Sequence, residues 1–224
     1  MDEASPARPY HHGNLRSALV EAGYALAVDE GPQALTLRGA TRRAGVSPTA
    51  AYRHFADLDE LRTAVGFRAL QAMAGAIEQH QHKVTAIAGL PRRRELLEAV
   101  GTGYIAFALD HPNAFRVGLF GLLGMQHAEL PAGAGQTGRT PFQLLTDALT
   151  GLAAVGALER DSVSSAAIHC WSSVHGFASL AILGPLRSQP RAVQDDMARR
   201  LVRDVVDGVL GAHAVRNRLG AWRV

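Results

Sequence analysis

The stretch AGVSPTAAYRHF, residues 44–55, ends one helical pattern at Gly45 and begins another at Ser47. Glycine just after a helix favours its termination, and serine followed by proline is typical of a helix N-terminus. The second helix is too short to be stable alone, because isolated helices of fewer than about 12 residues are marginal in water. Neighbouring segments must therefore hold it, and its aromatic and basic face is available to a partner.

The segments before this stretch also have helical patterns. Apolar residues recur at helical spacing over residues 15–26, with Asn14 as a candidate N-cap. Gly31 and the proline after it stop that helix, and Thr36 is a candidate cap for a short helix over residues 37–44. Helix, short helix, glycine turn and short helix form the order of a helix-turn-helix, whose second helix lies in the major groove of DNA.

Downstream of residue 55 the sequence predicts only helices. Asp57 is a candidate cap for a long helix that reaches about His82 without a proline. Residues 130–140, which are rich in glycine, predict a loop or a mobile segment. The other predicted helices cover 91–109, a segment beginning at Pro112, 141–155, 162–183 and 190–215. We therefore expect an all-α fold of about nine helices, with an N-terminal three-helix unit and a bundle of about six.

Composition restricts the class of protein. The single cysteine, Cys170, rules out an internal disulfide framework and is typical of a reducing compartment. We find no secretory leader and no apolar run of the ~18 residues that a membrane span needs, so we expect a cytoplasmic protein with no membrane partner. The formal net charge is +3. Between Gly31 and Ala56, however, there are four arginines and no acidic residue, a local patch that suits phosphate contact.

The run TLRGATRRAGVSPTAAYRHFADLDEL, residues 36–61, resembles the DNA-binding segment of the TetR family of bacterial transcription regulators. Downstream, CWSSVHGF, residues 170–177, carries the W-x-x-x-H-G pattern of one branch of TetR-like C-terminal domains. The stretch FALDHPNAFRVGLF, residues 107–120, also resembles that family's fifth-to-sixth helix junction.

The resemblance implies an organisation and a function. It implies a homodimer whose DNA-binding domain covers residues 8–57 and whose ligand-binding and dimerisation domain covers residues 58–224. It further implies a transcription repressor that a small molecule releases from double-stranded operator DNA. No cofactor, metal or enzymatic activity is expected.

The resemblance also assigns DNA contacts. Thr36 matches a capping position that faces a phosphate, and Arg38 matches one that reaches a base edge or a phosphate. Arginine can bind guanine O6 and N7 with two hydrogen bonds, whereas Tyr52 and His54 are expected to contact the backbone and fix the register. The expected DNA-binding residues are Thr36, Arg38, Ser47, Thr49, Tyr52, Arg53 and His54.

Two positions depart from the family pattern. Leu58 occupies a place where the family often has a phosphate-binding lysine. Gly39 lies inside the second helix, where glycine costs about 1 kcal/mol relative to alanine. Without the lysine, the phosphate contact must come from the helix N-terminus or be absent, so the departures bear on the strength of DNA binding and not on its existence. The second helix is expected to be frayed or slightly strained.

The C-terminal region has more apolar residues than a thin bundle needs, which favours a ligand cavity. No acidic residue interrupts the apolar faces of 96–109 and 163–183, so the expected ligand is apolar, and neutral or weakly anionic. Trp171 and His175 share a helix face, and such a pair is more often core packing with a satisfied histidine than a ligand contact. The candidate pocket residues are Tyr104, Phe107, Phe115, Phe120, Phe142, Trp171 and His175, with Met125 and His127 as further candidates.

The helices over 162–183 and 190–215 are the expected dimer interface. Small residues in the first permit close approach, and valines at helical spacing in the second form an apolar stripe. The small residues are Ser165, Ala166, Ser172 and Gly176, and the valines are Val202, Val205, Val206 and Val209.

Three hypotheses remain open. In the first the protein is a ligand-responsive regulator. In the second it is a DNA-binding regulator without an effector, whose C-terminal domain is collapsed or faces another protein. An enzyme that uses Cys170 or a histidine is the third, less favoured hypothesis, because a thiol nucleophile needs a positioned base and oxyanion donors.

Overall fold

The computed structural model describes residues 15–119 and 129–220; the side chains of residue 119 and of residues 212–220 are outside that description. Within these ranges the chain forms nine α-helices and short 3-10 turns, without a β-strand, which confirms the all-α fold. None of the described helices is long and apolar enough to span a membrane. The predicted cap Asn14 and the pocket candidates Phe120, Met125 and His127 lie outside the described residues.

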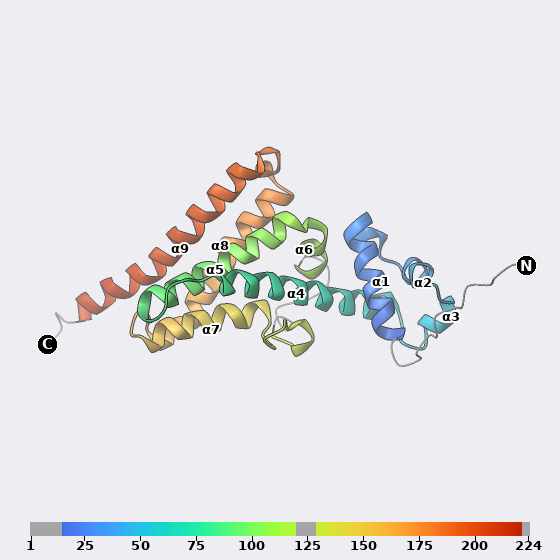
Figure 1. Cartoon of the computed structure of the whole chain (residues 1–224), viewed down its shortest axis with the longest axis horizontal. Helices are drawn as coiled ribbons and strands as arrows, with labels where there is room; N and C mark the ends of the chain where they lie inside the picture. The colour runs from blue at the N-terminus through green and yellow to red at the C-terminus, as the bar shows by residue number, and fades with distance from the viewer. Residues whose placement is uncertain (1–14, 120–128, 221–224) are drawn as a thin grey trace, which may run out of the picture.

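The helices form a small group at one end of the molecule and a larger bundle beside it along the long axis (Figure 1). The small group contains α1, α2 and α3, and α4 runs from it into the bundle, where it packs on α5. The helices are α1 (Leu15–Glu30), α2 (Leu37–Ala44), α3 (Pro48–Ala51), α4 (Leu58–His82), α5 (Gly89–Asp110), α6 (Pro112–Leu119), α7 (Pro141–Ala154), α8 (Val163–Ile182) and α9 (Arg191–Gly220).

The predicted caps of the N-terminal helices are confirmed. The side chains of Thr36, Ser47 and Asp57 accept hydrogen bonds from backbone N–H groups three residues later, over 3.0, 3.3 and 2.9 Å. Gly45 has a φ of 69°, the left-handed conformation that ends α2 and that glycine adopts without strain. These four residues set the boundaries of α2, α3 and α4.

Gly39 has a packing role that the sequence did not reveal. A Cβ atom at this position would lie 2.7 Å from Leu26 Cδ2 and 2.9 Å from the capping oxygen of Thr36. Glycine therefore lets α2 pack closely on α1. The expectation of a frayed helix is wrong, because α2 is continuous from Leu37 to Ala44.

Two clusters of buried apolar side chains hold the fold together, and α4 contributes to both. Leu61 and Val65 join the cluster under α1–α3, which also includes Phe55. Met73 and Ile77, three turns further along α4, join the larger cluster of the bundle. One continuous helix therefore connects the two ends of the molecule. The domain boundary at residue 57 stays a prediction.

The glycine-rich segment 130–140 is a loop that is held on α4. The Glu78 carboxylate, on a residue that is only 4% exposed, accepts hydrogen bonds from three groups of this loop. The donors are the backbone N–H of Gln136, 3.1 Å away, and the backbone N–H and the hydroxyl of Thr137, at 2.9 and 2.6 Å. Of the two expectations for this segment, the loop is the one that the structure shows.

The predicted valine stripe of α9 faces inward and not toward a second copy. Val202, Val205, Val206 and Val209 are all buried within the single chain, as is Ala166 on α8. The expectation that these residues form the dimer interface is wrong, because their side chains already pack in the bundle core.

Candidate nucleic-acid interface and ligand pocket

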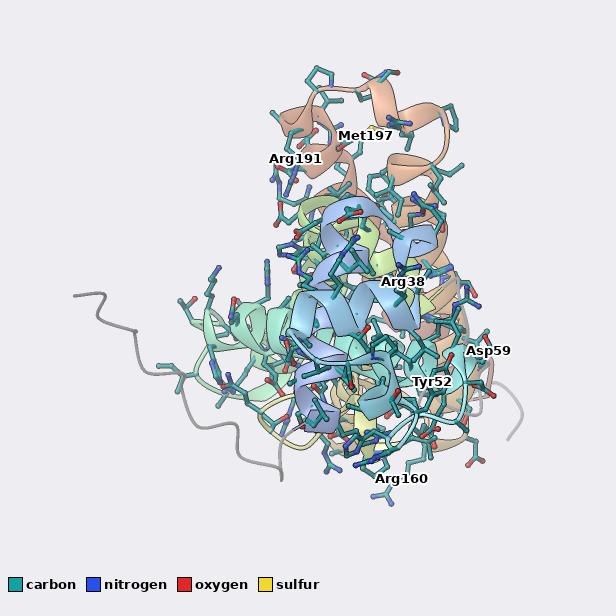
Figure 2. The ribbon with its side chains drawn as sticks, turned by 90° about the vertical axis from the view of Figure 1, so that its right-hand side faces the viewer. Arg38, Tyr52, Asp59, Arg160, Arg191 and Met197 are labelled. Atoms are coloured by element: carbon teal, nitrogen blue, oxygen red, sulfur yellow. The ribbon has the colours of Figure 1, made fainter. Side chains whose placement is uncertain are left out.

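The end of the molecule formed by α2 and α3 exposes almost all the residues expected to contact DNA. Figure 2 looks onto this end and shows Arg38 and Tyr52 on it. Tyr52 is 61% exposed, so most of its ring is accessible to a partner. His54 is half-buried, and the exposed members of the predicted set are Thr36, Arg38, Ser47, Thr49, Tyr52 and Arg53.

The helix α3 is a single turn, and three of the predicted contact residues follow it. Tyr52, Arg53 and His54 lie in consecutive turns, with their backbone N–H groups bonded to carbonyl oxygens of the preceding turn. Beneath them, Ala51 and Phe55 are buried against α1 and α4. These two anchors compensate for the shortness of the helix and keep the polar side chains on the outer face.

The arginines of this end differ in their surroundings. Arg43 forms an ion pair with Asp29, near the end of α1. Arg38, Arg42 and Arg53 are exposed and form no ion pair within the described part of the chain. These three are therefore the arginines with guanidinium groups available for an anionic partner.

Acidic side chains surround the start of α4. Asp57 already caps this helix, and the Glu60 carboxylate accepts a hydrogen bond from the backbone N–H of Ala56 over 2.8 Å. Leu58, where the family often has a lysine, is half-buried. Carboxylates thus occupy two of the backbone N–H donors at this helix start, where an anion is otherwise attracted.

A cavity of about 190 Å³ lies in the bundle. Its wall is formed by side chains of α4, α5, α7, α8 and α9, with Gly118 of α6. Apolar groups predominate, as is usual for small-molecule sites. The lining residues include Leu70, Met73, Val100, Tyr104, Phe142, Leu145, Cys170, Trp171, Val174, His175, Val202 and Val206.

The cavity brings together four of the predicted pocket residues, Tyr104, Phe142, Trp171 and His175. Two others do not line it. The ring of Phe115 packs behind the wall, with its centroid 5.6 Å from that of Tyr104. Phe107 packs instead against His111, with the ring centroids 5.3 Å apart.

Sequence reasoning missed several lining residues. The sequence places Leu70 and Met73 only within a long helix, and it predicts that the valines of α9 face a second copy of the chain. Their helical spacing was visible in the sequence. That spacing shows that a helix has an apolar face but not what covers it.

Two polar side chains in the cavity wall are joined by a hydrogen bond. The Tyr104 hydroxyl lies 2.8 Å from His175 Nδ1. Burial raises the pKa of Tyr104 and lowers the pKa of His175. Both shifts favour the uncharged forms at neutral pH, because a charge in an apolar environment loses its hydration.

Cys170 also lines the cavity, and its surroundings disfavour a nucleophilic role. Burial raises the pKa of the thiol to about 11. The nucleophilic form is the thiolate, which is scarce at neutral pH when the pKa is this high. Among the described residues no group of three or more His, Cys, Asp or Glu side chains is placed to hold a metal ion.

Comparison with known families matches both parts of the chain. Residues 19–65 match the family of bacterial regulatory proteins named after TetR. Residues 97–205 match the Tetracyclin repressor-like C-terminal domain. The first match contains the caps and exposed residues of the N-terminal end, and the second contains most of the cavity wall. Between them the two matches cover more than half of the sequence.

Solved structures share the fold over most of the chain. A protein of unknown function from Rhodococcus sp. RHA1 is 25% identical, with a TM-score of 0.67 over 91% of this chain and 100% of the other. The transcriptional regulator SCO7222, a TetR from Streptomyces coelicolor, is 18% identical, with a TM-score of 0.59 over 88% and 98% of the two chains. The multidrug binding protein EbrR, complexed with imidazole, is 17% identical, with a TM-score of 0.50 over 85% and 93%.

The N-terminal helix-turn-helix, the helical C-terminal bundle and these matches agree with one another: the chain belongs to the TetR family of bacterial transcription regulators.

Proposed function

We propose that the protein is a homodimeric repressor that an apolar small molecule releases from its operator DNA. The observation that carries this proposal is the position of α4, which forms part of the cavity wall at Leu70 and Met73 and packs under the DNA-facing end at Leu61 and Val65. A DNA-binding regulator acts where the chromosome is, so the proposed location is the bacterial cytoplasm.

The proposed DNA contacts are the exposed groups of α2, α3 and the turns that follow. Arg38 and Arg53 would contact base edges or phosphates, and Tyr52 would contact the backbone and fix the register. Thr36 and Ser47 would face phosphates at the starts of their helices. Thr49 and His54 complete the proposed set. The DNA-binding domain is proposed to end at residue 57 and the ligand-binding and dimerisation domain to begin at residue 58.

The proposed dimer interface is the outer face of α8 and α9, which pack side by side. Large apolar side chains on this face are exposed in the single chain, with exposed fractions of 48% for Ile168 and 37% for Met197. Small residues lie between them, and Cβ atoms at Gly176 and Gly208 would meet open space. A second copy of the chain would cover this face, and two-fold symmetry makes the interface self-complementary.

The proposed release mechanism uses α4 as a rigid connection. Its 25 residues span about 37 Å at 1.5 Å per residue, and it contains no proline that would let it bend locally. A ligand that displaces its cavity end would move its DNA end and change the separation of the two recognition elements. On a palindromic site these elements must lie ~34–36 Å apart, or a multiple of that.

Selection of binding sites from random DNA duplexes, followed by binding measurements, tests the DNA part of the proposal. We expect a palindromic site and an affinity that falls steeply with salt, since each neutralised phosphate contributes about −0.9 to the log–log slope. Sedimentation at micromolar concentration should give a dimer. Recovery of no preferred sequence would contradict operator recognition, and a monomer that binds the full palindrome would contradict the dimer.

Reciprocity tests the release mechanism. A ligand that weakens DNA binding must itself bind more weakly in the presence of saturating operator, by the same factor. Equal ligand affinities with and without operator would favour the alternative, a regulator without a small-molecule effector.

A further inference from the structure

The size of the cavity limits the size of a ligand. The cavity volume is about 190 Å³. An engineered apolar protein cavity of about 150 Å³ holds one benzene molecule. A molecule with one ring and small substituents therefore fills this volume, whereas a long alkyl chain would extend beyond it.

The rings of the wall favour an aromatic ligand. Phe142 and Trp171 are in edge-to-face contact with centroids 6.3 Å apart, and Trp171 and His175 lie 5.8 Å apart. Aromatic rings prefer such offset and edge-to-face arrangements, which contribute about 0.5–1.5 kcal/mol beyond the burial of area. A ligand ring inside the cavity can join this group of rings in the same way.

The wall has no formal charge to pair with a charged ligand. None of the described lining residues is Asp, Glu, Lys or Arg. The three lining side chains that can ionise, Tyr104, Cys170 and His175, have pKa values that burial shifts toward the neutral form. Burying an unpaired charge is costly, so a cation and an anion are both disfavoured.

The hydrogen-bonded side chains of the wall leave room for one polar group on the ligand. The Tyr104 hydroxyl shares a hydrogen bond of 2.8 Å with His175 Nδ1. When Tyr104 donates to Nδ1, its oxygen keeps an acceptor position. A ligand hydroxyl can donate to that position.

From these four observations we infer that the effector class is a neutral, single-ring aromatic molecule with one hydroxyl group that donates to Tyr104. This inference deepens the proposed function, because it names the ligand class of the same cavity and rests on that cavity being the effector site.

Probes of matched shape test the charge and size of the ligand. Calorimetric titration of the full-length protein would compare p-methylbenzyl alcohol, which is neutral, with p-methylbenzylamine and p-toluate, which at pH 7 are a cation and an anion. Dodecanol tests a long chain. We expect the alcohol to bind at least about tenfold more tightly than either ion, because neither charge finds a partner in the wall. We also expect it to bind more tightly than dodecanol.

A conservative substitution tests the hydrogen bond. Tyr104→Phe keeps the ring and removes the oxygen, so the alcohol should lose about three- to tenfold in affinity, the range of a single hydrogen bond. The affinity for p-xylene, which has no hydroxyl, should stay within about twofold. Tyr24→Phe is the matched control, since Tyr24 lies on α1 and not in the cavity wall.

The outcomes separate this inference from the proposed function. Three results would overturn the ligand class. The first is an ion or dodecanol that binds as tightly as the alcohol, and the second is an equal loss of affinity for the alcohol and p-xylene in Tyr104→Phe. The third is that none of the probes binds. None of these results affects operator binding by the free protein. If the alcohol binds as expected but leaves operator affinity unchanged, the ligand class stands and the proposed release mechanism fails.

Discussion

The hydroxyl of Thr137 donates a hydrogen bond to the Glu78 carboxylate over 2.6 Å, although the two residues are 59 positions apart in the sequence. The same carboxylate also accepts from two backbone N–H groups of the loop. A buried carboxylate is tolerated only when such donors replace its water. Glu78 therefore ties the loop that precedes α7, and with it the cavity residue Phe142, to the long helix α4.

Removing this carboxylate should destabilise the protein. We expect Glu78→Ala to lower the free energy of unfolding by about 3 kcal/mol, since hydrogen bonds to a charged group are the stronger ones and the loop donors are left unpaired. Glu78→Gln keeps one acceptor oxygen and should lose less. Urea denaturation at a fixed protein concentration measures both changes. Equal stabilities of Glu78→Ala and the wild type would show that the loop is not held by this residue.

The arginines of the DNA-facing end should differ in how much their loss weakens DNA binding, according to whether each is already paired within the protein. Arg53→Ala should weaken specific DNA binding by about 1–3 kcal/mol and relax the preference at one base pair. Arg38→Ala should weaken binding and reduce the salt slope. Arg43→Ala is the matched control, because this arginine pairs with Asp29 on the protein surface, where an ion pair contributes at most about 1 kcal/mol. Fluorescence anisotropy on the selected operator measures all three, and an Arg43→Ala defect as large as that of Arg53→Ala would contradict the assignment.

A lysine at position 58 should strengthen DNA binding. Leu58→Lys restores the positive charge that the family often carries at this place, beside the carboxylates that now occupy the start of α4. We expect tighter binding to any duplex and a salt slope that is steeper by about 0.9 per protomer, because one more phosphate is neutralised. Leu58→Met is the control for altered packing. An unchanged slope would mean that residue 58 does not reach the DNA backbone.

A charge on the outer face of α8 should prevent the proposed dimer from forming. We expect Ile168→Glu to give folded monomers that do not hold a palindromic operator, because each copy would bury an unpaired carboxylate. Ile87→Glu is the matched control, since Ile87 is 93% exposed and lies in the loop between α4 and α5. Sedimentation and circular dichroism measure association and folding. A dimeric Ile168→Glu variant would place the interface elsewhere.

Two glycine-to-alanine substitutions should have opposite effects on stability. Gly39→Ala should destabilise the protein by ~1–3 kcal/mol, because overpacking against Leu26 outweighs the gain in helix propensity. Gly75→Ala lies in α4, where the added methyl group meets nothing within 4 Å. It should stabilise the protein by about 1 kcal/mol at most. Thermal denaturation compares them, and a stabilised Gly39→Ala variant would show that the close approach of α2 to α1 is not needed.

The sequence by itself determined the features that depend on neighbours within a few positions. Thr36, Ser47 and Asp57 cap their helices because each side chain reaches a backbone N–H three residues away. Gly45 ends α2 because its own backbone adopts a conformation that costs glycine nothing. The class of fold and the helix-turn-helix follow from such local interactions, which is why they were predicted correctly.

Only the tertiary structure decided which helix face meets which neighbour. Val206 and Ile168 are both apolar residues at helical spacing, but the first is buried in the core of its own chain and the second is exposed. Tyr104 and His175 are 71 positions apart, and their hydrogen bond exists only because α5 packs on α8. A helix with apolar residues on more than one side has no local signal that orients it, so its orientation is set by the combined packing of the other helices.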